Sequence, residues 1–277
     1  MRRVVFLFLI IISTIGCQQT DEPLDFTMLT NLPKDKGGQH LAFPYLSTDA
    51  PFGHYVYLPS SYNDVASARY PLLIFLHGSG ESGNSSSDKD RLKLVLRNGP
   101  PKMIEAKTWK PTYPMIVVSP QSHYNGWKAN DIDLLIKYIV AHYPINETRI
   151  YLTGLSMGGF GTFTYLTERG NLGRVAAAIA ICGGGNLSKV SACSKIPIWV
   201  FHGDADNTVP MSNSVNFVEA YNNQTPVAVR KAKLTIYPNV GHDSWTKTYD
   251  GSGKGSERKD YDIFNESIYD WMFKYQK

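Results

Sequence analysis

Short apolar runs alternate with helix-like stretches along most of this chain. Mostly apolar runs stand at residues 54–58, 72–76, 115–118, 150–153, 177–182, 198–201 and 234–237. Runs of this length, rich in β-branched residues, are typical of strands, and a continuously apolar run such as 72–76 is typical of a strand buried on both faces. The alternation predicts an α/β fold with a mostly parallel central sheet and helices on both faces.

Helical spacing of apolar residues marks the segments between the strands. The stretch 131–142 carries apolar residues at helical spacing, and we expect Asn130 or Asp131 to be its N-cap. Residues 160–168 follow a glycine-rich turn and also predict a helix. The last helix is expected to begin near Tyr261. Its apolar face would be formed by Ile263, Phe264, Ile268, Trp271 and Met272.

The first residues are typical of an export signal. Arg2 and Arg3 precede the apolar run 4–12, and small residues then lead to Cys17. The run is too short for a permanent membrane span. We expect 1–16 to be a lipoprotein signal peptide, Cys17 to be lipidated, 17–39 to be a polar tether and 40–277 to be a single domain. Thr14 stands where lipoprotein signals usually have leucine, so a plain secretory signal is the alternative.

Composition and charge limit the kinds of partner and cofactor that we expect for this chain. The net charge is +4, and no long basic stripe is present, so nucleic acid is not an expected partner. No Cys/His cluster has the spacing of a metal site, so we expect no metal, and we expect no cofactor. Besides Cys17 the chain has Cys182 and Cys193. A disulfide between them stays open, although their expected positions at opposite edges of the sheet argue against it.

The pentapeptide 154–158, Gly-Leu-Ser-Met-Gly, carries the clearest chemical signal. It follows the strand-like run 150–153 and precedes a helix-like run, which is the context of a nucleophile elbow with Ser156 as nucleophile. An ordinary glycine-rich turn between strand and helix is the alternative. A serine hydroxyl is a weak nucleophile at neutral pH, so the hypothesis requires a base and an orienting carboxylate elsewhere in the chain.

Both partners are present downstream, in the order Ser, Asp, His that this fold uses. Asp204 and Asp206 follow the apolar run 198–201, at the strand end where such sheets bind ligands. We prefer Asp206 as the acid because it lies deeper in the loop, and expect Asp204 to bond backbone N–H groups. His242 is the only histidine after Asp206, so it is the expected base.

An oxyanion hole needs two N–H donors aimed at the developing negative charge. The backbone N–H of Met157, directly after the nucleophile, is one expected donor. The other should come from the turn after the strand 72–76, where Ser79 is preferred and Gly80 is second. His77 precedes this turn, and His202 stands in a similar His-Gly step, so we expect structural roles for both.

Residues 76–83, 153–161, 199–206 and 241–245 together resemble bacterial secreted α/β-hydrolases of the carboxylesterase or "predicted peptidase" type. These are related to feruloyl and acetyl esterases and to polyhydroxybutyrate depolymerase-like esterases. The resemblance runs from about residue 40 to the C-terminus. It implies an α/β-hydrolase fold and serine carboxylesterase chemistry through an acyl-enzyme. The glycine-rich segment 183–186 stands where many lipases have a helical lid, so we expect no large lid domain.

The expected substrate is a small-molecule or oligosaccharide ester, with Trp127 and Trp245 as candidates to stack on a sugar or aryl ring. Ordinary packing is the alternative for both tryptophans. A small open-site serine peptidase is the second hypothesis for function, and a non-catalytic binding lipoprotein is the third. The signal predicts an exported protein that is anchored to the membrane through Cys17, on the periplasmic side or at the cell surface, or else a soluble secreted protein.

Overall fold

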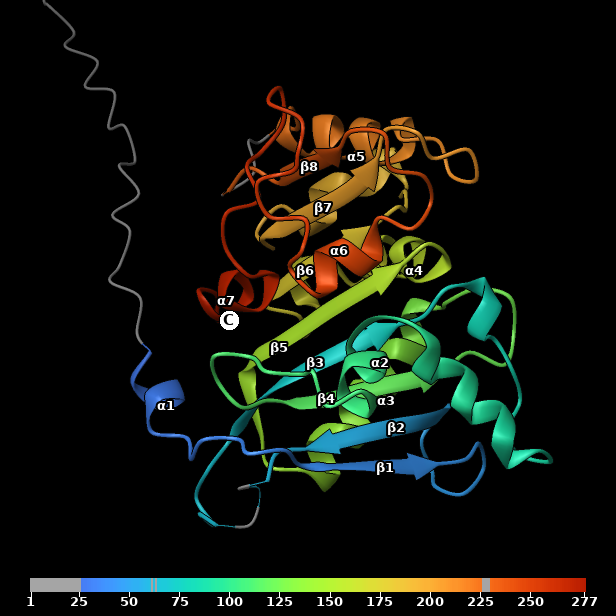
Figure 1. Cartoon of the computed structure of the whole chain (residues 1–277), viewed down its shortest axis with the longest axis vertical. Coiled ribbons are helices and arrows are strands. Elements are labelled where there is room, and N and C mark those ends of the chain that lie inside the picture. Colours follow the sequence, from blue (N-terminus) through green and yellow to red (C-terminus); the bar gives the residue numbers. More distant parts are fainter. Residues whose placement is uncertain (1–25, 61, 63, 226–229) are drawn as a thin grey trace, which may run out of the picture.

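The computed structural model describes residues 26–60, 62, 64–225 and 230–277, and these form an α/β-hydrolase fold (Figure 1). A central sheet has the strand order β1-β2-β4-β3-β5-β6-β7-β8. Strands β3 to β8 pair in parallel, whereas β2 is antiparallel to both of its neighbours. The strands are β1 Gln39–Phe43, β2 Gly53–Leu58, β3 Tyr70–Leu76, β4 Ile116–Gln121, β5 Ile145–Leu155, β6 Ala177–Ile181, β7 Ile198–Gly203 and β8 Lys233–Tyr237.

Helices cover both faces of the sheet. Helices α3, α4 and α5 lie on one face, and α2, α6 and α7 lie on the other (Figure 1). The helices are α1 Thr27–Thr30, α2 Gly99–Glu105, α3 Ala129–His142, α4 Met157–Arg169, α5 Ser212–Asn222, α6 Trp245–Tyr249 and α7 Ile268–Phe273. Four 3₁₀ helices complete the described elements: η1 Ser79–Glu81, η2 Lys89–Arg97, η3 Gly170–Leu172 and η4 Leu187–Cys193.

The buried strands explain the continuous apolar runs of the sequence. Every position of β3, β4, β6 and β7 is buried, because helices pack on both sides of the sheet. A β3 residue such as Ile74 is fully excluded from solvent. Parallel pairing places the carboxyl ends of β3, β5, β6 and β7 along one edge of the sheet. The loops at this edge are where sheets of this kind bind their ligands.

Two expected helix starts differ from the structure. Helix α3 begins at Ala129 after Lys128, with no side-chain cap, because Asp131 instead accepts a hydrogen bond from the Tyr124 hydroxyl at 2.6 Å. The last helix begins at Ile268, not near Tyr261. The backbone N–H of Asp262 donates to Leu234 O at 2.8 Å, so this stretch runs along the edge strand β8 and cannot close helical turns.

The segment expected to be a polar tether packs against the domain over its described part. Residues 27–30 form the short helix α1, and Leu29 is only 1% exposed. Asp35 accepts a hydrogen bond from the Tyr57 hydroxyl of β2 at 2.6 Å. The expected signal peptide 1–16 and Cys17 lie outside the described residues.

The two described cysteines are both free and buried. Cys182 follows β6 at the carboxyl edge of the sheet, and Cys193 ends η4 before β7 begins. The disulfide that the sequence left open is therefore not formed.

Candidate active site

Ser156 stands at a strained turn between β5 and α4. Its backbone has φ 52° and ψ −118°, in a region that non-glycine residues rarely adopt. The flanking glycines are required by close backbone contacts. A Cβ on Gly154 would lie 2.2 Å from Gly158 O, and a Cβ on Gly158 would lie 1.9 Å from Leu76 O. The turn therefore has the tight geometry that the pentapeptide predicted.

The three side chains singled out from the sequence meet in one hydrogen-bonded row. Ser156 Oγ lies 2.9 Å from His242 Nε2, and His242 Nδ1 lies 2.7 Å from Asp206 Oδ2. The Asp206 side chain is fully buried, whereas that of His242 is 22% exposed. The carboxylate fixes the Nδ1–H tautomer, which leaves Nε2 free to accept the serine proton.

Asp206 is held as a carboxylate by several donors. Its Oδ1 accepts the backbone N–H groups of Thr208 and Val209, each at 2.9 Å. Burial by itself would raise the pKa of Asp206. The hydrogen bonds from His242, Val209 and Thr208 outweigh that effect and hold the pKa below its ordinary value. Asp206 is therefore ionised at neutral pH and faces the imidazole as an acceptor.

Asp204 points to a different part of the same loop. Its Oδ1 accepts the backbone N–H of Asn239 at 2.7 Å, and its Oδ2 lies 3.3 Å from Arg258 Nη1. These contacts tie the β7 loop to the loop that carries His242. The structure thus places Asp206 against the base and gives Asp204 the loop-bonding position expected from the sequence.

The two expected oxyanion donors begin short helices beside the serine. Met157 is the first residue of α4, and Ser79 is the first residue of η1, so neither N–H has a partner inside its own helix. A Cβ built on Gly78 would lie 3.6 Å from the Ser156 Cβ, so this turn packs directly against the nucleophile. Both residues thus begin helices next to Ser156, and each has a backbone N–H that is free of intrahelical bonds.

His77 is fully buried and structural. Its Nε2 accepts the backbone N–H of Ser122 at 2.9 Å, and its Nδ1 lies 2.6 Å from Gly78 O. Burial lowers the pKa of His77 to about 4, so the ring is neutral at physiological pH. It fixes the turn that presents Ser79.

His202 is also fully buried, and it touches the triad carboxylate. Its Nε2 lies 2.9 Å from Val209 O and 3.2 Å from Asp206 Oδ2, while its Nδ1 lies 2.7 Å from Ser214 Oγ. Both neighbours of Nε2 are acceptors, so this nitrogen carries a proton. The structural role expected for His202 thus extends to the orientation of Asp206.

The two tryptophans proposed to stack on substrate differ in position. Trp127 is only 6% exposed, donates from Nε1 to His77 O at 3.2 Å and packs against Phe52, so stacking on a sugar ring is excluded for it. Trp245 is half-buried and meets His242 edge-on, with ring centroids 5.2 Å apart. Of the two candidates, only Trp245 can reach a bound substrate.

Asn98 lies near the site and was not singled out from the sequence. Asn98 Oδ1 accepts from Trp245 Nε1 at 3.2 Å, and the Asn98 amide donates to the buried carboxylate of Glu81. This chain anchors Trp245 beside His242. No motif marks Asn98, because its role depends on α2, which it caps, and α6 meeting in space.

The sequence marks Cys182 as the end of a strand and as a candidate disulfide partner, whereas in the structure its thiol lies beside Asp206 and His242. Cys182, Asp206 and His242 each offer a donor atom within 4.8 Å of the others. The carboxylate and imidazole atoms already bond to each other there. Burial raises the pKa of the Cys182 thiol to about 12, so it remains a neutral packing group. Its place directly after β6 at the carboxyl edge was the available signal.

The sheet order, the strained serine turn and the hydrogen-bonded row define the chain as an α/β-hydrolase. Residues 63–250 match the Phospholipase/Carboxylesterase family model, so the chain belongs to that family.

A curated relative and two solved structures are similar to this chain. The bifunctional acetylxylan esterase/xylanase XynS20E of Neocallimastix patriciarum is 27% identical over 195 residues, which cover 67% of this chain and 26% of that protein. A thermostable esterase has a TM-score of 0.60 and 29% identity, covering 87% of this chain and 63% of that one. A feruloyl esterase module of Clostridium thermocellum, solved with sinapinate, has a TM-score of 0.56 and 16% identity, covering 92% of this chain and 93% of that module.

No helix in the described part of the chain is long and apolar enough to cross a membrane.

Proposed function

We propose that this chain is a serine esterase that removes acyl groups from plant polysaccharide, with Ser156, His242 and Asp206 as the catalytic triad. The observation that carries the proposal is the unbroken row from Ser156 Oγ through His242 to Asp206, with contacts of 2.9 and 2.7 Å. The similarity to an acetylxylan esterase supports a carbohydrate-linked ester as substrate. Acetyl and feruloyl esters are the two acyl groups to be compared.

The reaction proceeds in two stages, in which an acyl-enzyme forms on Ser156 and is then hydrolysed. Ser156 Oγ attacks the ester carbonyl carbon while His242 Nε2 takes the hydroxyl proton, and the carbonyl oxygen becomes an oxyanion bound by the N–H groups of Met157 and Ser79. The tetrahedral intermediate collapses, the C–O bond to the alcohol breaks, and His242 returns the proton to the leaving oxygen. This leaves an ester between the acyl group and Ser156.

A water molecule then attacks the acyl-enzyme. His242 accepts one water proton, the oxyanion forms again at the same two amides, and collapse releases the carboxylic acid as the proton returns to Ser156 Oγ. Asp206 keeps the imidazole in one tautomer and stabilises its positive charge in both stages. The described chain between β6 and β7 forms the short helix η4 and no lid domain.

Hydrolysis of 4-nitrophenyl acetate by the wild type and Ser156→Ala tests the triad. We expect a loss of kcat of roughly a thousandfold or more in the variant. Thermal denaturation shows whether both proteins fold. Equal rates for the two folded proteins would refute the nucleophile assignment.

A second assay separates the substrate classes. Acetate release from acetylated xylan and ferulate release from arabinoxylan are compared with cleavage of short peptides by the same preparation. We expect polysaccharide ester turnover, and faster peptide cleavage would favour the peptidase hypothesis.

We also propose that the protein is exported and anchored through lipid on Cys17. The supporting pattern is the basic start, the apolar run 4–12 and the small residue Gly16 before the cysteine. Labelled palmitate should be incorporated into the wild type expressed in a bacterial host. Equal labelling of Cys17→Ser would contradict the proposal and leave a cleaved secretory signal as the explanation.

A further inference from the structure

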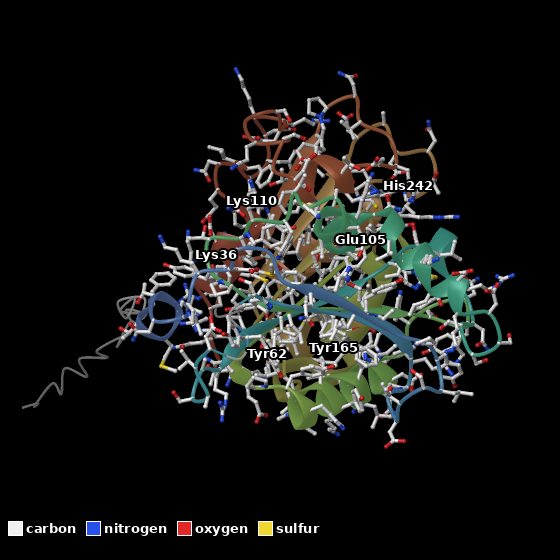
Figure 2. The ribbon with its side chains drawn as sticks, turned by 60° about the horizontal axis from the view of Figure 1, so that its bottom comes forward. Lys36, Tyr62, Glu105, Lys110, Tyr165 and His242 are labelled. Atoms are coloured by element: carbon white, nitrogen blue, oxygen red, sulfur yellow. The ribbon has the colours of Figure 1, made fainter. Side chains whose placement is uncertain are left out.

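A cavity of about 960 Å³ lies away from the triad, between the segment around α1 and the segment that follows α2. In Figure 2 the cavity residues Lys36 and Lys110 lie apart from His242. None of the three triad residues lines this cavity. It is therefore a separate site, and the proposed ester chemistry does not use it.

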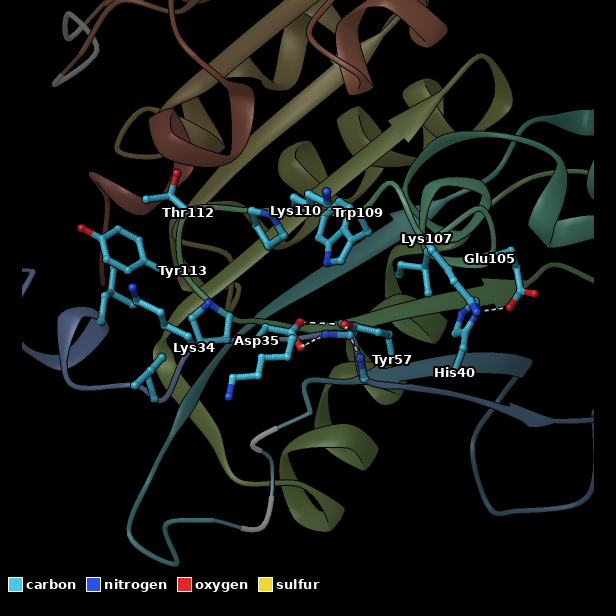
Figure 3. A pocket seen from close by; sticks show the side chains of 18 of the residues that line it. Lys34, Asp35, His40, Tyr57, Glu105, Lys107, Trp109, Lys110, Thr112 and Tyr113 are labelled. Atoms are coloured by element: carbon cyan, nitrogen blue, oxygen red, sulfur yellow. Dashed lines mark hydrogen bonds and ion pairs between the residues drawn. The ribbon is translucent and has the colours of Figure 1, made fainter.

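Aromatic side chains form part of its wall. Trp109 lies between Tyr113 on one side and His40 on the other (Figure 3). Tyr57 is fixed in place, because its hydroxyl donates to Asp35 at 2.6 Å and accepts from Gly38 N at 2.8 Å. Trp109 is 8% exposed and Tyr57 is 4% exposed, so they give the cavity a rigid wall and do not stack on a ligand.

The same wall holds a buried donor and a buried acceptor without partners among the described residues. Trp109 is 8% exposed, and its Nε1–H meets no acceptor there. The His40 side chain is also 8% exposed, with Nδ1 at 2.6 Å from Glu105 Oε1 and no described partner at Nε2. Burial lowers the pKa of His40 despite Glu105, so the neutral ring offers Nε2 as an acceptor. Sugar hydroxyls both donate and accept, and they match this pair.

The charge around the cavity selects for an anion. Lys34, Lys36, Lys107 and Lys110 line it, and none of them forms an ion pair within the described structure. Both carboxylates of the wall are already engaged. Asp35 accepts the backbone N–H groups of Gly37 and Ser60 at 3.0 Å in addition to the Tyr57 hydroxyl, and Glu105 accepts from His40.

We propose that this cavity binds an oligosaccharide that carries a uronic acid, with its hydroxyls on Trp109 Nε1 and His40 Nε2 and its carboxylate on the lysines. The choice of a polysaccharide fragment as the ligand rests on the proposed function. The positions of the residues that line the cavity do not depend on that function. Two polymers carry this chemistry, glucuronic-acid-substituted xylan and polygalacturonate.

Isothermal titration calorimetry on the full chain tests the proposal with three ligands of equal length. These are xylotetraose with one glucuronic acid, tetragalacturonate and neutral xylotetraose. We expect at least one acidic ligand to bind about tenfold more tightly than the neutral one, and its affinity to fall with added salt. The stronger of the two acidic ligands identifies the polymer.

Lys36→Gln combined with Lys110→Gln should weaken the acidic ligand about tenfold and the neutral ligand less than about twofold. Both lysines are exposed, so the variant should fold. Lys189→Gln, an exposed lysine on η4 outside the cavity, is the matched control. Trp109→Phe keeps an aromatic side chain but removes the indole N–H, and should weaken both kinds of ligand.

Turnover of 4-nitrophenyl acetate separates this proposal from the proposed function. It should stay unchanged in the lysine variants, because the cavity lies apart from the triad. Equal affinity for acidic and neutral ligands, unchanged binding in the double variant, or complete displacement by equimolar inorganic phosphate would overturn the uronic acid site even if the esterase activity is confirmed.

Discussion

The Nε2 atom of His202 lies 3.2 Å from Oδ2 of Asp206, the same oxygen that accepts from His242 at 2.7 Å. Both His202 and the Asp206 carboxylate are fully buried. Burial lowers the pKa of His202, so at neutral pH the ring contributes a neutral N–H donor. Two imidazoles thus converge on one carboxylate oxygen, and His202 helps to orient the carboxylate.

Replacement of His202 should therefore lower kcat and leave KM nearly unchanged. In His202→Leu the carboxylate loses a donor, and a charge-assisted hydrogen bond is worth about 1.5–3 kcal/mol, so we expect roughly a tenfold loss of kcat. His202→Gln keeps an N–H near the same position and should recover part of it. Steady-state kinetics checks this. A parallel loss of folded protein in both variants would indicate a purely structural role.

Asp206→Asn should be far more damaging than Asp204→Asn. An amide at Asp206 cannot accept from Nδ1–H and stabilise the imidazolium at once, and the comparable change in a serine protease costs roughly 10⁴ in kcat. Asp204 only bonds the Asn239 amide and Arg258 at the loop surface, so its variant should retain most activity. Ester hydrolysis under saturating substrate measures both. A larger loss at Asp204 would reverse the assignment.

Gly158→Ala should abolish correct folding of the elbow, whereas Gly80→Ala should be tolerated. A Cβ at Gly158 would lie 1.9 Å from Leu76 O and 2.7 Å from His77 O, so β3 and α4 would have to separate. A Cβ at Gly80 would meet nothing within 4 Å. Thermal melts and activity of the two variants check this contrast. Wild-type activity in Gly158→Ala would show that the turn relaxes more easily than its geometry indicates.

The protein should lose stability as the pH is lowered, because His77 binds a proton more readily in the unfolded chain than in the native protein. Its pKa is about 4 in the native protein against 6.5 in the unfolded chain, so between these values only the unfolded chain binds the proton. The free energy of unfolding should therefore drop by about 3 kcal/mol more in the wild type than in His77→Gln as the pH is lowered from 6.5 to 4. Urea denaturation across this range measures the difference. Parallel curves for the two proteins would contradict the assignment.

The parts of the fold predicted from sequence are those fixed by local pattern. The buried strands such as β3 and β7 have continuous apolar runs, and the elbow at Ser156 requires glycine neighbours that are visible in the chain. A last helix carrying Ile268, Trp271 and Met272 was predicted, but its predicted start near Tyr261 was wrong. The stretch from Tyr261 is apolar at helical spacing, yet its backbone bonds the free edge of β8, a tertiary effect that periodicity does not report.

For the site as well, some residues could be predicted from the sequence and others could not. Ser156, Asp206 and His242 follow from their order along the chain and their positions at strand ends. The contribution of Asn98 depends on two helices meeting, and the contact between His202 and Asp206 depends on how one loop turns back on itself. Trp127 was a stacking candidate because of its loop position, but packing against Phe52 and His77 buries it.

The strand order also has a consequence for how activity appears during folding. Ser156 and His242 are 86 positions apart, and the loops that carry them follow β5 and β8, which are separated by β6 and β7 in the sheet. Their hydrogen bond cannot form before these intervening strands have paired, and such long-range parallel pairing is slow. Recovered ester hydrolysis is therefore a marker of the last steps of refolding, and it should lag behind the return of secondary structure.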